Sequence, residues 1–282
     1  MRPIRILGLP GHAQSAEYLR GRLAKHLEIW GPEFELVALD PVEPMSPATI
    51  IGDGHRSETT VASNFRWWDW TSHRRFKPGE LERALLHFRN AWEAEGPFDV
   101  IFGFSQGAAF AVLVLALLED PNLHPIWSRP SPRADIEWPP RPVRCAVLCS
   151  AYGPGDPAYQ RWFDAKRPTT PTLHLLGRND PVLDSVHALD TAARFEHAEL
   201  HWHTGGHYIP RKPYWAALMR EFMVRHCGVR APPAQLSFAE LSSPTESAAS
   251  SAGESGGSFF PLTSMSSLTE IAAEAEGEWE DA

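Results

Sequence analysis

The chain has 282 residues, 43% of them hydrophobic, and a formal net charge of −9. This hydrophobic content is sufficient for a packed core, which excludes a wholly disordered or fibrous protein. The charge imbalance lies entirely in residues 231–282, which hold nine acidic side chains and no Lys or Arg, whereas the first 230 residues hold 26 of each sign. The first 230 residues therefore have no net formal charge, and the acidic segment would repel phosphate. We expect no nucleic-acid partner.

The cysteines and the apolar runs indicate the compartment. There are three cysteines and no CxxC pair, so neither a disulfide scaffold nor a structural zinc site is expected. The longest apolar run, residues 108–118, has eleven residues, whereas about 20 are needed to cross a bilayer. The first residues lack the pattern of a secretory signal. We therefore expect a soluble cytoplasmic protein that does not bind membranes.

Short apolar runs alternate along the chain with longer segments of helical periodicity. The runs predict strands over residues 4–9, 34–39, 99–102, 143–149, 172–176 and 200–203. The longer segments predict helices over residues 13–26, 79–94, 106–119, 185–197 and 213–227. This alternation predicts an α/β fold in which a mostly parallel sheet of about six strands carries helices on both faces.

Two stretches interrupt the alternation, residues 40–78 and residues 121–142. The second holds seven prolines, too many for a helix or a central strand, so we expect it to be irregular. The first contains the cluster Trp67-Trp68-Asp69-Trp70. Because long loops inside a compact domain are often functional, we expect these tryptophans to be exposed and to form the wall of a binding site.

The composition changes after Pro232-Pro233. The last 52 residues contain eleven serines, four glycines and nine acidic residues. Such a segment buries too little apolar surface to offset the entropy of ordering it, so we expect a folded body over residues 1–230 and a disordered, acidic, Ser-rich tail over residues 231–282. A short amphipathic docking helix over residues 268–275 is the alternative for part of that tail.

The pentapeptide Gly103-Phe104-Ser105-Gln106-Gly107 matches the GxSxG pattern. It lies between an apolar run that predicts a strand and one that predicts a helix, the context of a nucleophile elbow. An ordinary Gly/Ser turn is the alternative. The context favours Ser105 as a nucleophile, and its hydroxyl needs a base because it is too weakly acidic to react unaided.

Candidates for that base and for an orienting acid follow in the order serine, acid, histidine. Asp180 comes after the predicted strand 172–176, at the edge where open α/β sheets build their sites. A helix cap is the alternative role for Asp180, and Asp184 is the competing acid. His207 follows two glycines, between the last predicted strand and the last helix, and is the expected base.

Acyl transfer also needs two backbone N–H donors, the oxyanion hole, for the developing negative oxygen. We expect one from Gln106, directly after the nucleophile, and the other from His12, in the loop after the first strand. A metal site at His201, His203 and His207 would have suitable residue types but no carboxylate helix motif. We therefore expect neither a metal nor a cofactor.

Five stretches together resemble a family of small serine hydrolases from fungi and animals, an α/β-hydrolase group. These are residues 6–14, the Trp67-Trp68 region, and residues 96–99, 103–109 and 205–210. The resemblance extends from residue 4 to about residue 227. It implies the α/β-hydrolase fold, the triad of Ser105, Asp180 and His207, and an oxyanion hole formed by the amides of His12 and Gln106.

The sequence departs from this family at two places. Pro10 stands where the family often has His, a change that should alter loop packing more than the main-chain donor. Ser150-Ala151-Tyr152 stands where the family usually has Ser-Gly-Phe, which changes the pocket locally.

The resemblance implies a hydrolase that cleaves a carboxylic ester or thioester through an acyl-enzyme. Aromatic side chains near the expected mouth favour an apolar acyl chain or an aromatic ketide, and the predicted substrate-binding residues are Trp67, Trp68, Tyr152 and Tyr208. Fungal relatives commonly accompany polyketide synthases and release or edit the thioester-bound product, which implies an acyl carrier domain as a partner. The alternatives are an idle scaffold that binds a small molecule or a protein, and a C–C or peptide hydrolase with the same triad.

Overall fold

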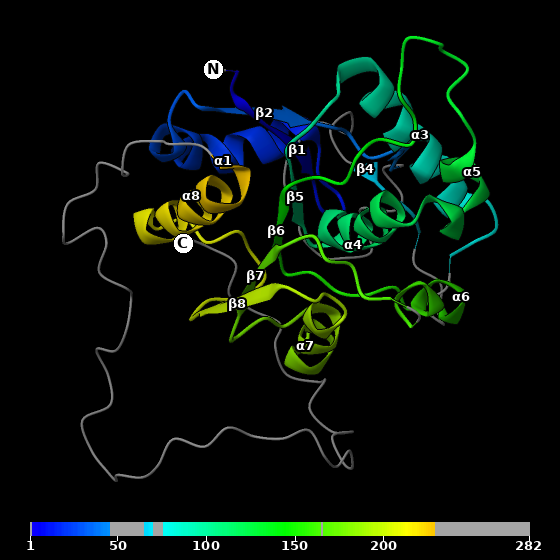
Figure 1. Ribbon diagram of the computed structural model, residues 1–282. Helices are drawn as coiled ribbons and strands as arrows, with labels where there is room; N and C mark the ends of the chain where they lie inside the picture. Colours follow the sequence, from blue (N-terminus) through cyan, green and yellow to red (C-terminus); the bar gives the residue numbers. More distant parts are fainter. Residues whose placement is uncertain (1, 46–64, 70–75, 165, 229–282) are drawn as a thin grey trace, which may run out of the picture. The chain divides into compact units, whose positions relative to one another are not determined.

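The computed structural model describes residues 2–45, 65–69, 76–164 and 166–228 (Figure 1). The predicted tail over residues 231–282, the docking helix over residues 268–275 and Trp70 lie outside the described residues.

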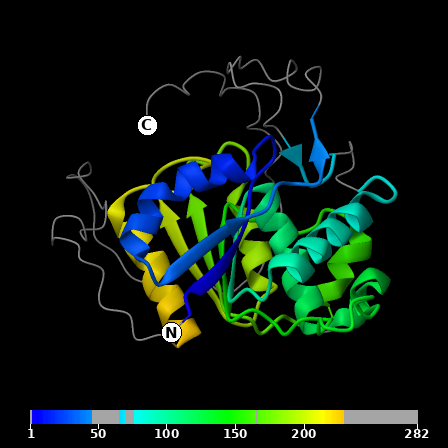
Figure 2. The ribbon, with the colours of Figure 1, turned by 90° about the horizontal axis from the view of Figure 1, so that it is seen from above.

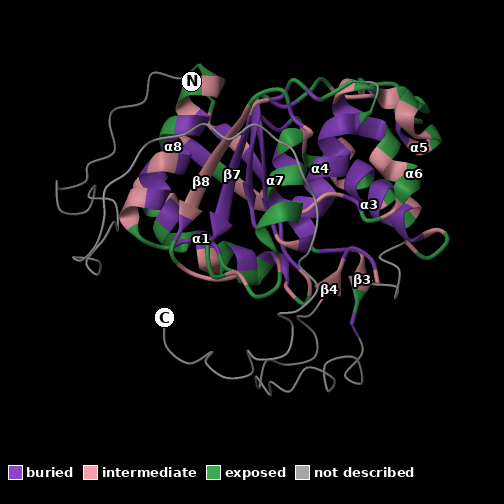
Figure 3. Cartoon of the chain, turned by 90° about the horizontal axis from the view of Figure 1, so that it is seen from below, coloured by how far each residue is buried: buried purple, intermediate pink, exposed green. Residues whose placement is uncertain are grey.

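One parallel sheet of six strands organises the described part of the chain. Its strands are β1 (Ile4–Leu9), β2 (Phe34–Ala38), β5 (Val100–Phe104), β6 (Cys145–Cys149), β7 (Thr172–Gly177) and β8 (Ala198–His203). They lie in the order β2-β1-β5-β6-β7-β8, and every pair is parallel. The central strands β5, β6 and β7 are buried along their whole length because helices cover both faces, whereas the edge strand β8 is mostly half-buried (Figure 3).

Helices cover the sheet on both sides (Figure 2). On one face, α1 (Ala16–Trp30) packs against α8 (Pro213–Cys227), and both bury apolar side chains against the strands. Two hydrogen bonds join these helices, because Trp30 Nε1 donates to the Ala216 carbonyl at 2.9 Å and Arg220 Nε donates to the Trp30 carbonyl at 3.0 Å. On the other face lie α3 (Glu80–Glu95) and α4 (Gln106–Glu119), and α7 (Ser185–Ala193) connects β7 to β8. The α/β architecture predicted from the sequence is confirmed.

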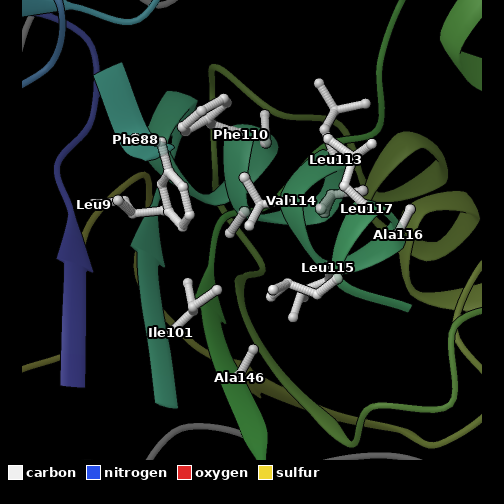
Figure 4. Close-up of a cluster of buried hydrophobic side chains, with 14 of the residues drawn as sticks. Leu9, Phe88, Ile101, Phe110, Leu113, Val114, Leu115, Ala116, Leu117 and Ala146 are labelled. Atoms are coloured by element: carbon white, nitrogen blue, oxygen red, sulfur yellow. The ribbon is translucent and has the colours of Figure 1, made fainter. Parts of the chain in front are cut away.

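Helix α4 lies at the centre of the larger core. Every residue from Gln106 to Leu118 is buried, which agrees with the apolar run that predicted it. Figure 4 shows Val114 of this helix on the side toward Ile101 of β5, and the rings of Phe110 and of Phe88 in α3 beside each other. Each such side chain contributes roughly 1.5–3 kcal/mol when fully buried, so the turn at the start of α4 rests on a rigid base. No helix in the described part of the chain is long and apolar enough to span a bilayer.

The sequence did not reveal the short elements. A two-stranded antiparallel ladder joins β3 (Glu43–Pro44) to β4 (Phe65–Arg66). The expectation of no helix in residues 121–142 is wrong for α5 (Pro125–Ser128), because proline fits the first helical position, where its missing N–H costs nothing. A second short helix is α6 (Pro157–Gln160), and 3₁₀ turns lie at Pro121–Leu123 and Arg161–Phe163.

Candidate active site

Ser105 occupies the turn between β5 and α4, and its backbone is strained. Its φ of 51° and ψ of −118° lie in a region that residues other than glycine rarely adopt. The turn is held by its own amide, which donates to the Cys149 carbonyl of β6 at 2.9 Å. Crowding explains the flanking glycines: a Cβ on Gly103 would lie 2.6 Å from Ala108 Cα, and one on Gly107 would overlap the Leu9 and Pro10 carbonyl oxygens. This geometry is that of a nucleophile elbow.

The three polar side chains predicted to act together do meet. His207 Nε2 lies 2.8 Å from Ser105 Oγ, and His207 Nδ1 lies 2.8 Å from Asp180 Oδ2. The Asp180 side chain is 3% exposed and the His207 side chain 11% exposed, so the pair is shielded from water. With its Nδ1 proton donated to the carboxylate, the imidazole presents Nε2 as an acceptor to the serine hydroxyl.

The surroundings of Asp180 favour its ionised form. Burial alone would raise the pKa of the Asp180 carboxyl, but the hydrogen bond and charge of His207 and the backbone N–H groups of Leu183 and Val182 outweigh it. The pKa therefore lies below its ordinary value of 3.8. An acid that is ionised and held by two backbone amides is suited to orienting an imidazole.

Close packing fixes the loop that carries His207. A Cβ on Gly177, at the end of β7, would lie 2.6 Å from the Gly205 carbonyl oxygen and would overlap that of Gly206. His203 is buried at the end of β8, and its Nδ1 accepts the Gly205 N–H at 3.2 Å. The Tyr208 side chain fills the space beside Gly205, and its ring lies 4.9 Å from that of His203. Of the two glycines before His207, Gly205 is therefore the one that packing requires, since a Cβ there would overlap the Tyr208 side chain, whereas a Cβ on Gly206 would lie 3.2 Å from its nearest neighbour.

Asp184 serves a different purpose. It is the N-cap of α7, where its side chain accepts the N–H groups of Val186 and His187. Its other oxygen lies 2.6 Å from His187 Nδ1, and both side chains are more than half exposed. Asp184 thus acts as a helix cap, and Asp180 is the carboxylate that reaches His207.

The expected oxyanion hole has its two segments beside Ser105. The Gln106 N–H, in the first turn of α4, has no acceptor among the described residues, as is usual at a helix start. A Cβ on Gly11 would lie 3.2 Å from Ser105 Cβ, so the loop after β1 lies against Ser105. The Gly11 N–H itself is held by Gln14 Oε1 at 3.0 Å. The donor role of the His12 amide in this loop stays a prediction.

The expectation that the tryptophans are exposed is wrong for Trp67 and Trp68, which are 0% and 4% exposed. The Trp67 ring stacks on Phe110 of α4 with centroids 4.5 Å apart. Tyr152 is half-buried against the same core, whereas Tyr208 is 36% exposed. An isolated cluster of tryptophans gives no sign of the helix that will cover it, so its burial could not be inferred from the sequence.

The three histidines considered for a metal have other partners or positions. His207 contacts Ser105 and Asp180, His203 accepts a backbone N–H, and His201 is half-buried on β8. The described residues contain no group of three His, Cys, Asp or Glu side chains that could hold a metal ion.

The side chain of Gln106 has a role that the sequence analysis missed. It is fully buried at the head of a helix in which all residues from 107 to 118 are apolar or glycine. It hydrogen-bonds the backbone of Trp67 and Trp68. The signal was available, because a polar side chain at the head of an otherwise apolar buried helix must find partners.

Comparison with known proteins places the chain in a family. The family described as serine hydrolase (FSH1) matches residues 1–218. The chain belongs to the FSH1 serine hydrolase family. Human esterase OVCA2 is 30% identical over 224 residues, covering 74% of this chain and 90% of that protein. The zebrafish (Danio rerio) esterase OVCA2 is 25% identical over 236 residues, covering 79% of this chain and 97% of that protein.

Solved structures agree with the fold of this FSH1 family member. The chain resembles Zea mays acyl-protein thioesterase 2 with a TM-score of 0.52 at 16% identity, covering 80% of this chain and 94% of that one. The FSH1 family member therefore has the α/β-hydrolase fold and is an enzyme of the serine hydrolase class.

Proposed function

We propose that the enzyme hydrolyses carboxylic esters or thioesters through an acyl-enzyme on Ser105. The observation that carries this proposal is the line of contacts from Asp180 Oδ2 through His207 to Ser105 Oγ, with 2.8 Å at each step. Hydrogen-bond distances of this length are those required between a nucleophile, its base and the orienting acid.

The geometry supports a two-step reaction. Ser105 Oγ attacks the acyl carbon while its proton passes to His207 Nε2, and the amides of Gln106 and His12 stabilise the negative oxygen of the tetrahedral intermediate. Collapse of that intermediate breaks the bond to the leaving alcohol or thiol, which takes the proton from His207. Water then attacks the acyl-enzyme and gives its proton to His207. His207 passes this proton to Ser105 Oγ as the bond between Oγ and the acyl carbon breaks, and the carboxylic acid leaves. Asp180 stabilises the imidazolium in both steps.

Two observations support esters and thioesters as the substrate class. The relatives named above are esterases, and an acyl-protein thioesterase shares the fold. Within this class we propose a thioester-bound polyketide as substrate, with an acyl carrier domain as the partner that presents it, on the strength of the motif resemblance. The described cysteines Cys145, Cys149 and Cys227 are buried free thiols, which supports a cytoplasmic location for the reaction.

A matched substrate pair tests the proposal. We expect purified enzyme to hydrolyse the oxoester and the pantetheine thioester of one aromatic acyl group, and Ser105→Ala to hydrolyse neither. If the enzyme cleaved both and the pantetheine thioester of a polyketide were no better than that of acetate, the narrower substrate would be wrong and the reaction class would stand. If neither substrate were cleaved by folded enzyme, the reaction class itself would be wrong.

A further inference from the structure

We infer that the Trp67 indole and the Gln106 side chain are positioning residues that hold the two halves of the oxyanion hole in register. This inference rests on the function proposed above. It concerns side chains of which neither touches the reacting atoms, and it gives the Trp67-Trp68 region a role other than lining the substrate site.

The hydrogen bonds of the Gln106 side chain join α4 to residues 67–68. Gln106 Oε1 accepts the Trp67 N–H at 3.0 Å, and Gln106 Nε2 donates to the Trp68 carbonyl at 2.9 Å. The amide side chain therefore pairs with the backbone of two consecutive residues, as a neighbouring strand would. Since Gln106 is fully buried, both bonds are shielded from water. The backbone N–H of Gln106 is the first expected oxyanion donor. The hydrogen bonds of the Gln106 side chain therefore hold this donor in place.

The Trp67 indole joins residues 67–68 to the loop after β1. Trp67 Nε1 donates to the Pro10 carbonyl at 2.9 Å, and this bond is also buried. The Pro10 carbonyl lies so close to Gly107 that a Cβ there would overlap it. Two residues after Pro10 comes His12, the second expected donor. A series of hydrogen bonds therefore connects Gln106 through Trp67 to the Pro10 carbonyl, in the loop that lies against Ser105.

The packing of the Trp67 ring does not by itself require the hydrogen bond to Pro10. The Trp67 ring already stacks on Phe110 at 4.5 Å between centroids, and a phenyl ring could make the same stack. The additional feature is a directed N–H bond to a carbonyl of the oxyanion loop. Loss of that bond frees the carbonyl to shift, and a displacement of about 1 Å at a catalytic group can reduce a rate by about 100-fold.

The chain offers a matched control in Trp30. Its side chain is also 0% exposed, and its Nε1 donates to the Ala216 carbonyl at the same distance of 2.9 Å, on the opposite face of the sheet. Trp67→Phe and Trp30→Phe therefore remove the same indole bond at equal burial. Only the first bond leads to the oxyanion loop.

We propose to measure kcat, KM, unfolding free energy and the rate of Ser105 phosphonylation for both variants. The phosphonyl oxygen occupies the oxyanion hole during labelling, so that rate reports on the hole directly. For Trp67→Phe we expect kcat and the labelling rate to fall together by about 10- to 100-fold, within the range for a displaced donor, while KM changes little. For Trp30→Phe we expect a comparable loss of stability with kcat within about twofold of wild type.

Equal kcat values for the two variants at equal stability would overturn the inference. If Trp67→Phe failed to fold, Gln106→Met provides the second measurement, because it keeps side-chain length, removes both backbone bonds and leaves the indole in place. We expect the same fall in kcat and labelling rate for folded Gln106→Met, and an unchanged kcat would equally overturn the inference. Failure of the proposed function is distinguishable, since wild-type enzyme would then show neither turnover nor a Ser105 adduct.

Discussion

His207 Nε2 lies 2.8 Å from Ser105 Oγ, although 102 positions separate the two residues in the chain. The contact joins the turn after the central strand β5 to the loop after the edge strand β8. Both segments are held by backbone crowding at glycines, so the alignment is present before any substrate binds. A preorganised nucleophile and base are what a serine hydrolase needs to lower its barrier.

Removal of either side chain should greatly reduce turnover without unfolding the protein. Ser105→Ala loses the attacking oxygen, and His207→Gln loses the base, so we expect each to retain less than about a tenth of wild-type kcat. The double variant should be little worse than either single variant, because the members of the proposed triad should act as a unit. Steady-state kinetics with circular dichroism checks this. A His207→Gln enzyme above that level would mean that another group is the base.

The acid can be tested with a matched pair of aspartates. Asp180→Asn keeps the shape of the side chain but not the charge that orients His207, so we expect a loss of about 10⁴ in kcat with little change in stability. Asp184→Asn should stay active, because Asp184 caps α7 and its second oxygen contacts His187, and asparagine also caps helices well. Kinetics and chemical denaturation of both variants make the comparison. Exchanged phenotypes would make Asp184 the orienting acid.

The loop that carries His207 should be sensitive to one added methyl group. Gly177→Ala would push against the Gly205 and Gly206 carbonyl oxygens, which are backbone atoms and cannot rotate away. We expect kcat to fall by at least about tenfold, because His207 is displaced from Ser105. Gly21→Ala is the control: Gly21 lies exposed in α1 with nothing within 4 Å of the added carbon, so it should gain up to about 1 kcal/mol of stability at unchanged kcat. Wild-type kcat in Gly177→Ala would contradict the role of this packing.

A buried histidine outside the site should make stability depend on pH. Burial lowers the pKa of His174 in β7 from 6.5 to about 3. Between those values the unfolded chain binds a proton that the folded protein does not, so stability falls as the pH falls below 6.5. From pH 7.5 to pH 5 this residue should cost about 2 kcal/mol of unfolding free energy. Denaturation of wild type and His174→Leu at both pH values measures this effect. The fall in unfolding free energy between pH 7.5 and pH 5 should be smaller in the variant by that amount, and an equal fall in both proteins would contradict the lowered pKa of His174.

The sequence predicted the elements whose signals are local. The bounds of α4 and α8 agree with the prediction. The apolar run 108–118 marks α4, and the segment that begins at Pro213 and ends before Gly228 carries its own start and stop signals. The positions of Ser105, Asp180 and His207 at the ends of β5, β7 and β8 also follow from the strand order, since parallel strands end at one edge of the sheet.

Features that depend on distant partners were not predictable. The short strand β4 exists only because β3, more than twenty residues earlier, pairs with it. The burial of Trp67 depends on Phe110 of α4 and on the Pro10 carbonyl, neither of which is near it in the chain. The difference between Asp180 and Asp184 is also a matter of reach, because both begin an Asx-type cap and only Asp180 is within hydrogen-bond distance of His207.

Intact-protein mass spectrometry after incubation with a fluorophosphonate, followed by peptide mapping, tests the central claim most directly. We predict one adduct per chain, on Ser105, which forms in step with the loss of ester hydrolysis and does not form on denatured enzyme or on His207→Ala. Full ester hydrolysis by folded enzyme that carries no adduct, or an adduct on another residue that accounts for the inhibition, would contradict the account.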